Sequence, residues 1–294
     1  MKKLISIFIA ALLLLSGCSA PPTPQIAATT LPVYEFTQAL CQGTPLTVGR
    51  LITESVSCLH DYSLKVDQVK MAERAETVVI SGAGLEEFME DILDSSKTID
   101  ASQGIDLLLG EDAHTEDGQH HHEEDGHHHE QDPHIWLSPE NAKAMAQNIC
   151  QGLSRKYPQY KDTFEENLSP LLQKLDELEL YGKTQLEILS CRELITFHDG
   201  FAYFAQAFDL DILAAVEEES GSEASAKDLI SLIQLVRGHN LPGVFVEKNG
   251  SASAAGVITA ETGTKIFTLD MAMAGESYFN AMKHNIDAIK EAME

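Results

Sequence analysis

The sequence predicts an α/β protein of two lobes, each with a parallel-type sheet flanked by helices, joined by one long helix. Short runs rich in β-branched residues alternate with helical patterns in both halves of the 294-residue chain, and this alternation is typical of parallel sheets. Between the halves, leucines recur at helical spacing among charged residues. We expect the lobes to span 26–156 and 190–294, and the linking helix to span 157–189.

The first residues, "MKKLISIFIAALLLLSGC", indicate export. Two lysines precede an apolar stretch that is too short to span a bilayer but suits a signal peptide. Small residues before Cys18 resemble a bacterial lipobox, so we expect removal of residues 1–17, lipidation of Cys18 and a flexible tether over 18–25. The lipid would anchor the protein to the outer face of the bacterial cytoplasmic membrane. A plain signal peptide with an incidental cysteine is the alternative.

The elements of the first lobe follow from β-rich runs and the helical patterns between and after them. The expected strands are "IAATT" (26–30), "LTVGRLI" (46–52) and "TVVI" (77–80), with helices near 33–41, 65–75 and 84–94.

The second lobe repeats this alternation. Its expected strands are 194–197, 210–216, 243–247 and 265–269, with helices near 200–208, 225–238, 252–262 and 276–293.

The linking helix is predicted from five leucines on one face: Leu168, Leu171, Leu172, Leu175 and Leu178. Pro170 should either kink this helix or mark its true start. A stiff linking helix would limit hinge closure, so we expect loop and local lobe shifts rather than a wide clamshell motion.

Composition narrows the classes of function. The formal net charge of −26 disfavours nucleic acid and suits cations. After the lipobox four cysteines remain: Cys41, Cys58, Cys150 and Cys191. Exported thiols usually pair, and four allow three connectivities. Proximity in sequence favours Cys41–Cys58 and Cys150–Cys191.

Four potential metal ligands come from segments that are distant in sequence. Three follow predicted strands and one precedes a Ser-Pro-Glu helix start at 138–140; they are His60, His198, Asp270 and His134. Ligands bind beyond the carboxyl ends of the strands in open α/β sheets. Spacing alone does not decide between a shared site and four ordinary polar residues.

Five segments carry a family resemblance. They are "TTLPVYEFTQAL", "AERAETVVISGAGLEEFM" (72–89), "DPHIWLSPENAKAMA" (132–146), "TFHDGFAYFAQAF" (196–208) and "VFVEKNGSASAAGVITAETGTKIFTLD" (244–270). Together they resemble the zinc-binding solute-binding lipoproteins of ABC-type importers, and the third segment is the most specific match. The resemblance implies that the chain is not an enzyme. It implies a receptor that binds Zn²⁺ in the cleft between the lobes and delivers it to an ABC permease and its ATPase.

The resemblance also implies the ligand set. Position by position, the family's metal ligands fall on His60, His134, His198 and Asp270. Relatives that prefer manganese carry Glu where this chain has His198, so the resemblance favours zinc, which imidazoles suit. Around His60 the usual H-x-Y-E-P-like run is replaced by "HDYSL", which weakens that match.

Two further carboxylates match family positions near the site. Asp199 and Glu247 could each orient an imidazole through its other ring nitrogen. A helix cap or a solvated loop carboxylate is an equal alternative for each.

A run rich in histidine and acid precedes His134. It reads "EDAHTEDGQHHHEEDGHHHEQD", and we expect a flexible loop over 111–131. Its histidines are candidate weak, auxiliary metal ligands, as in many zinc members of the family: His114, His120, His121, His122, His127, His128 and His129. Solvated low complexity without a role is the alternative.

Two other classes of function are alternatives. A secreted zinc hydrolase would need an open coordination position and a base, but the sequence lacks H-E-x-x-H. A passive metal buffer would need only the histidine-rich run, without an ordered site.

Overall fold

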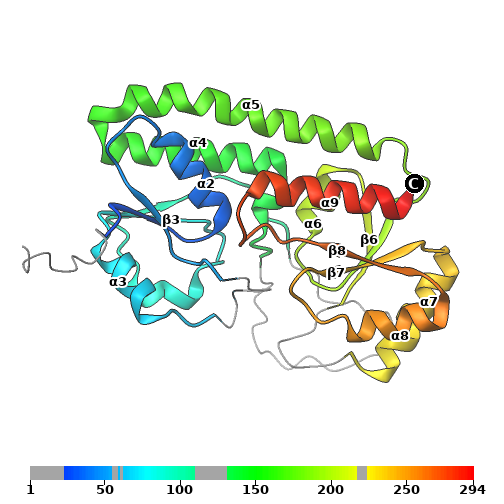
Figure 1. Ribbon diagram of the computed structural model, residues 1–294. Helices are drawn as coiled ribbons and strands as arrows, with labels where there is room; N and C mark the ends of the chain where they lie inside the picture. Colours follow the sequence, from blue (N-terminus) through cyan, green and yellow to red (C-terminus); the bar gives the residue numbers. More distant parts are fainter. Residues whose placement is uncertain (1–22, 55–58, 60–61, 110–130, 217–223) are drawn as a thin grey trace, which may run out of the picture.

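The computed structural model describes residues 23–54, 59, 62–109, 131–216 and 224–294 (Figure 1). The predicted signal peptide, Cys18, His60 and residues 111–130 of the histidine-rich run lie outside these ranges. In the described part of the chain, no helix combines the length and apolar character needed to cross a bilayer.

The first lobe contains a four-stranded parallel sheet with the order β2-β1-β3-β4. Its strands are β1 (Ile26–Ala28), β2 (Val48–Arg50), β3 (Thr77–Ile80) and β4 (Thr98–Asp100). The sequence predicted the first three; β4 was missed because Ile99 is its only apolar residue, so it forms no β-rich run. The helices of this lobe are α2 (Leu31–Leu40), α3 (Val66–Arg74), α4 (Pro139–Lys156) and the 3₁₀ helix η1 (Glu87–Ile92).

The second lobe repeats the architecture. Its parallel sheet has the order β6-β5-β7-β8, with β5 (Glu193–Thr196), β6 (Asp211–Ala215), β7 (Gly243–Glu247) and β8 (Lys265–Leu269). The helices are α6 (Ala202–Ala207), α7 (Ala226–His239), α8 (Ser253–Thr262) and α9 (Tyr278–Met293). In Figure 1, α7 and α8 lie on one side of this sheet and α9 on the other. The predicted two-lobe α/β fold is therefore confirmed.

The long helix α5 (Lys161–Leu186) joins the lobes, preceded by the short η3 (Pro158–Tyr160). Figure 1 shows it running above α4 and α9. Pro170 lies inside α5, so it does not mark the start of the helix. The α5 leucines Leu171, Leu175 and Leu178 are buried in a core that also includes residues of α2, α4 and α9. One hydrophobic core thus continues from the first lobe into the second.

Hydrogen bonds also cross between the lobes. The amide of Leu31 in α2 donates to the carbonyl oxygen of Met273 (2.9 Å), and the Trp136 indole donates to Met271 O (2.7 Å). The Tyr278 hydroxyl in turn donates to Trp136 O (2.8 Å). Because these groups are buried, separating the lobes would leave polar atoms without partners. The interface thus opposes a wide opening of the lobes.

The expected cysteine pairing is wrong for the described cysteines. Cys41, Cys150 and Cys191 are all free; Cys58 lies outside the described residues. Cys150 is buried in α4 of the first lobe, whereas Cys191 precedes β5 in the second lobe and its thiol contacts Glu193 O (3.8 Å). Proximity in sequence does not bring these two thiols together. Burial raises the pKa of the Cys41 thiol to about 12, so that thiol is unreactive.

Candidate functional site

His134 is held by a carboxylate two residues earlier in the chain. It lies at the start of the 3₁₀ helix η2 (Ile135–Leu137), and only 2 % of its surface is exposed. Asp132 Oδ1 accepts hydrogen bonds from the His134 backbone amide (2.8 Å) and from its ring Nδ1 (2.8 Å). With the Nδ1 hydrogen donated to a carboxylate, Nε2 is the nitrogen that can bind a metal.

The helix that follows η2 fixes the position of this segment. The side chain of Ser138 accepts from Asn141 N at the start of α4, and proline occupies the first turn. This is the Ser-Pro start that the sequence predicts. Trp136 is fully buried and anchors the same turn to the second lobe. His134 is therefore presented by rigid elements.

His198 comes from the other lobe and meets His134. It follows β5, and its ring centroid lies 5.3 Å from that of His134, with the two rings nearly perpendicular. Gly200 makes room for this pair. A Cβ at residue 200 would come within 2.8 Å of the His198 ring and 3.0 Å of the His134 ring. Two of the four predicted ligands are thus neighbours across the lobe interface.

Glu247 ends β7, the strand next to β5 in the sheet. Its Oε2 lies 3.7 Å from His198 Nδ1, and the residue is buried. Burial, and then the negative charge of Asp270, raise the pKa of Glu247 to about 8. A buried carboxyl beside the second imidazole fits the role of orienting it.

Asp270 follows β8 at the same edge of the sheet. Its backbone is fixed by Asn285 of α9, which accepts from Asp270 N (2.7 Å) and donates to Asp270 O (2.7 Å). Asp270 and Glu247 both line a small pocket of about 30 Å³. The Asp270 carboxylate accepts from Ala272 N (2.9 Å) and from Lys248 Nζ (3.1 Å). Its oxygens are therefore already engaged.

The four predicted ligands do not form a complete described site. Among residues that the structure describes, no three His, Cys, Asp or Glu side chains lie close enough together to hold a metal ion. His60 lies outside those residues. The described segment beside it is anchored, because Tyr62 N donates to Leu59 O (3.0 Å) and the Tyr62 hydroxyl donates to Glu54 (3.0 Å).

The ends of the histidine-rich run meet beside His134. Leu109 and Gln131 form an antiparallel bridge, and Asp132 N donates to Leu108 O (2.9 Å). The Tyr203 hydroxyl joins both ends, because it accepts from Leu108 N (2.9 Å) and donates to Asp132 O (3.0 Å). All seven histidines of the run lie outside the described residues.

Sequence reasoning missed Asp132 as the partner of His134. The signal was present, because Asp132 precedes His134 by two residues, with a proline between them that restricts the backbone. Of the two carboxylates that were predicted, Glu247 lies near an imidazole. Asp199 is half-buried in the turn after His198, and its role stays a prediction.

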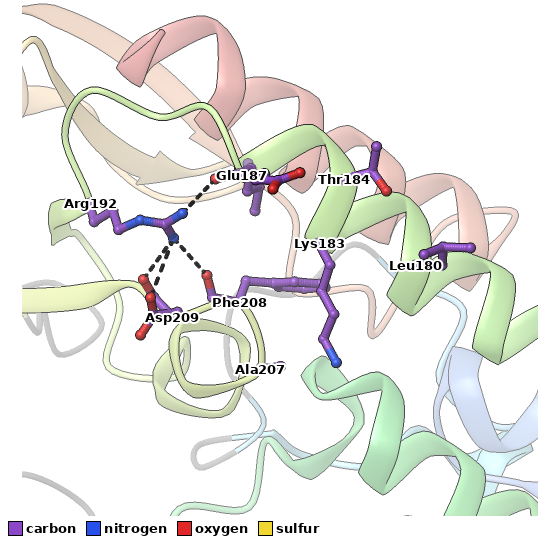
Figure 2. A pocket seen from close by; sticks show the side chains of 9 residues that line it. Leu180, Lys183, Thr184, Glu187, Arg192, Ala207, Phe208 and Asp209 are labelled. Atoms are coloured by element: carbon purple, nitrogen blue, oxygen red, sulfur yellow. Dashed lines mark hydrogen bonds and ion pairs between the residues drawn. The ribbon is translucent and has the colours of Figure 1, made fainter.

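A second pocket, of about 430 Å³, lies away from these residues (Figure 2). It is bordered by the end of α5 and the end of α6. The Arg192 side chain there donates to Leu186 O (2.8 Å) and to the carbonyl oxygens of Phe208 (3.2 Å) and Asp209 (3.0 Å). Arg192 thus satisfies carbonyls at the ends of both helices, which is a structural role.

Comparison with known proteins supplies a family match. The family described as "Zinc-uptake complex component A periplasmic" matches residues 26–292. The zinc-binding lipoprotein AdcA of Streptococcus pneumoniae (strain ATCC BAA-255 / R6) is 32 % identical over 313 residues. That alignment covers 100 % of this chain and 62 % of AdcA. The chain therefore spans less than two thirds of this curated relative.

Solved structures share the fold. A crystal structure of ZnuA aligns with a TM-score of 0.77 at 28 % identity, covering 92 % of this chain and 100 % of that one. A structure of Zn(II)-bound AdcA from Streptococcus pneumoniae aligns with a TM-score of 0.74 at 29 % identity, covering 92 % of this chain and 58 % of that one.

Proposed function

Since the chain belongs to the family of zinc-uptake complex component A proteins, we propose that it binds Zn²⁺ outside the cytoplasm and delivers it to an ABC permease for uptake. The protein makes and breaks no covalent bond; the ion is its cargo. The permease and its ATPase are the partners, and a lipid on Cys18 holds the receptor at the membrane surface. The name of the AdcA relative, a zinc-binding lipoprotein, supports the lipid anchor.

One observation carries the proposal: the meeting of His134 and His198 from different lobes, 5.3 Å apart between ring centroids, with a carboxylate held against the first ring (2.8 Å). A carboxylate that accepts from the other nitrogen of a ligating imidazole fixes the tautomer and raises its basicity. The second oxygen of Asp132 is buried and has no hydrogen-bond partner among the described atoms. A buried carboxylate oxygen without a partner is costly, and a nearby cation would offset that cost.

We assign four ligands to the bound ion: His60, His134, His198 and Asp270. Three neutral imidazoles and one carboxylate suit Zn²⁺, whereas Mn²⁺ prefers sites richer in oxygen. Asp132 and Glu247 orient the two imidazoles that the structure describes. Because the lobes share one core, capture and release involve shifts of the segments around the site rather than a wide hinge motion.

The histidine-rich run serves as a secondary zinc store. Its anchored ends, Leu109 and Gln131, keep it beside His134, where tethering raises the local zinc concentration. A strain whose receptor lacks residues 114–129 should grow normally in ample zinc and poorly when zinc is scarce. Equal growth under strict zinc limitation would show that the run has no role in uptake.

The proposed function is tested by zinc titration calorimetry on His134→Ala and His198→Ala. Each variant should lose at least tenfold in zinc affinity while its circular dichroism spectrum stays that of the wild type, because water replaces a lost imidazole poorly. His239→Ala is the matched control, since His239 is exposed and contacts Glu193. Wild-type affinity in either test variant would refute the ligand assignment.

Zinc titration and a turnover assay together separate the alternatives. A passive buffer would lose all tight binding when residues 114–129 are deleted and would be insensitive to His134→Ala. A hydrolase would turn over peptides or esters in the zinc-loaded form. The receptor account predicts one tight ion and no turnover.

A further inference from the structure

The predicted fourth ligand already has a cationic partner. Lys248 Nζ lies 3.1 Å from Asp270 Oδ2, and Ala272 N donates to Oδ1 (2.9 Å). Each oxygen of the carboxylate is thus engaged. Within the described ranges, Asp270 does not lie in a group of three potential ligands.

The sheet register creates this pair. The β7–β8 ladder ends with Glu247 opposite Leu269, and Lys248 N then donates to Leu269 O (2.8 Å). Lys248 and Asp270 are therefore the next residues on two adjacent parallel strands, where opposite charges attract. Both backbones are fixed, Lys248 by the ladder and Asp270 by Asn285, so only the side chains need to move.

We propose that Lys248 is an affinity-setting residue that competes with the bound cation for the carboxylate of Asp270. This inference rests on the proposed zinc function. For Asp270 to reach the ion with full charge, the ammonium group of Lys248 must release it. When the ion leaves, the ammonium group takes the carboxylate back.

This exchange of Asp270 between Lys248 and the ion suits a protein that delivers its cargo. An ion pair with an exposed lysine is weak, so it lowers zinc affinity modestly and does not prevent capture. The competition for Asp270 favours release, which a receptor that hands its cargo to a permease requires.

The test removes the charge and keeps a polar side chain. Lys248→Gln should bind zinc about three- to tenfold more tightly than the wild type at low ionic strength, with a smaller gain in high salt. Stopped-flow transfer of zinc to a chelator should be slower by a similar factor. Lys248→Arg should behave like the wild type. Lys265→Gln is the matched control, since it makes the same change in net charge at the far end of β8.

A double-mutant cycle with Asp270→Asn decides whether the effect passes through Asp270. The gain from Lys248→Gln should disappear in the Asp270→Asn background. A gain that persists there, or a Lys248→Gln affinity equal to that of Lys265→Gln, would overturn the inference. Failure of the wild-type protein to bind zinc would instead overturn the proposed function. Circular dichroism melting curves confirm that each variant is folded.

Discussion

Asp132→Ala isolates the contribution of the carboxylate that holds His134. The substitution removes the acceptor of two hydrogen bonds, one from the His134 amide and one from its ring Nδ1, both 2.8 Å. The hydrogen bond from the His134 amide forms with or without metal. Its loss therefore lowers the stability of the protein but leaves its zinc affinity unchanged. The ring bond strengthens the imidazole as a ligand, so its loss weakens binding.

The expected loss can therefore be given separately for zinc affinity and for stability. Loss of a carboxylate partner of a ligating histidine costs about 10- to 100-fold in metal affinity, which is about 1.4–2.8 kcal/mol. The unfolding free energy of the metal-free protein should fall by about 2–4 kcal/mol, because the buried donors lose a charged acceptor. Asp132→Asn keeps an acceptor oxygen and should lose less on both measures.

Competition with a chromophoric chelator measures the affinity, and urea unfolding measures the stability. Glu140→Gln is the control, because it removes one negative charge from a side chain that is 80 % exposed. An Asp132→Ala protein that binds zinc as tightly as Glu140→Gln would refute the argument that Asp132 acts on the site through His134.

Two further predictions concern the space beside Gly200 and the buried carboxyl group of Glu86. Gly200→Ala should displace both imidazoles, because its Cβ would come within 2.8 Å and 3.0 Å of their rings; zinc calorimetry should show weaker binding although no donor atom is lost. Burial raises the pKa of Glu86 to about 7, against the hydrogen bonds from Thr29, Ser81 and Gly82. The folded chain therefore holds a proton that the unfolded chain releases, and the stability from this group is lost as the pH rises through about 7. Urea unfolding of the metal-free protein should show a loss from Glu86 of about 2–3 kcal/mol between pH 5 and pH 8, which Glu86→Gln should abolish.

Matched controls make both results interpretable. Gly256→Ala adds a methyl group where no atom beyond the neighbouring backbone of its own helix lies within 4 Å, so it should leave zinc binding unchanged. An equal result for Gly200→Ala would contradict the packing argument. For Glu86, an equal pH dependence in the wild type and in Glu86→Gln would show that the carboxyl does not hold the proton in the folded state.

The sequence predicts the parts of the fold that rest on local pattern. The Ser138-Pro139 helix start, the long helix and seven of the eight strands that the structure describes follow from caps, periodicity and β-branched runs. β4 has a single apolar residue, Ile99, and so gives no such signal. The segment near 84–94, predicted as a helix, contains the 3₁₀ helix Glu87–Ile92. Positive φ angles at Gly82, Ala83 and Gly84 restrict that segment in a way that helical periodicity does not reveal.

The site is only partly predictable for a related reason. The histidines His134 and His198 follow from their places at element ends, and the structure brings them together. The contacts that these site residues make depend on how segments distant in sequence pack together. The partners of Asp270, for example, are set by the register of two strands that are 22 residues apart. Sequence spacing contains no information on that register.

The most direct test of the central claim is calorimetric titration of zinc into the protein that lacks residues 114–129. We predict one tight ion, with an affinity within about threefold of the wild type, because elements outside the run present His134 and His198. The weaker ions should disappear. Loss of the tight ion would contradict the account, since it would mean that the histidine-rich run, and not the meeting of the two lobes, forms the zinc site.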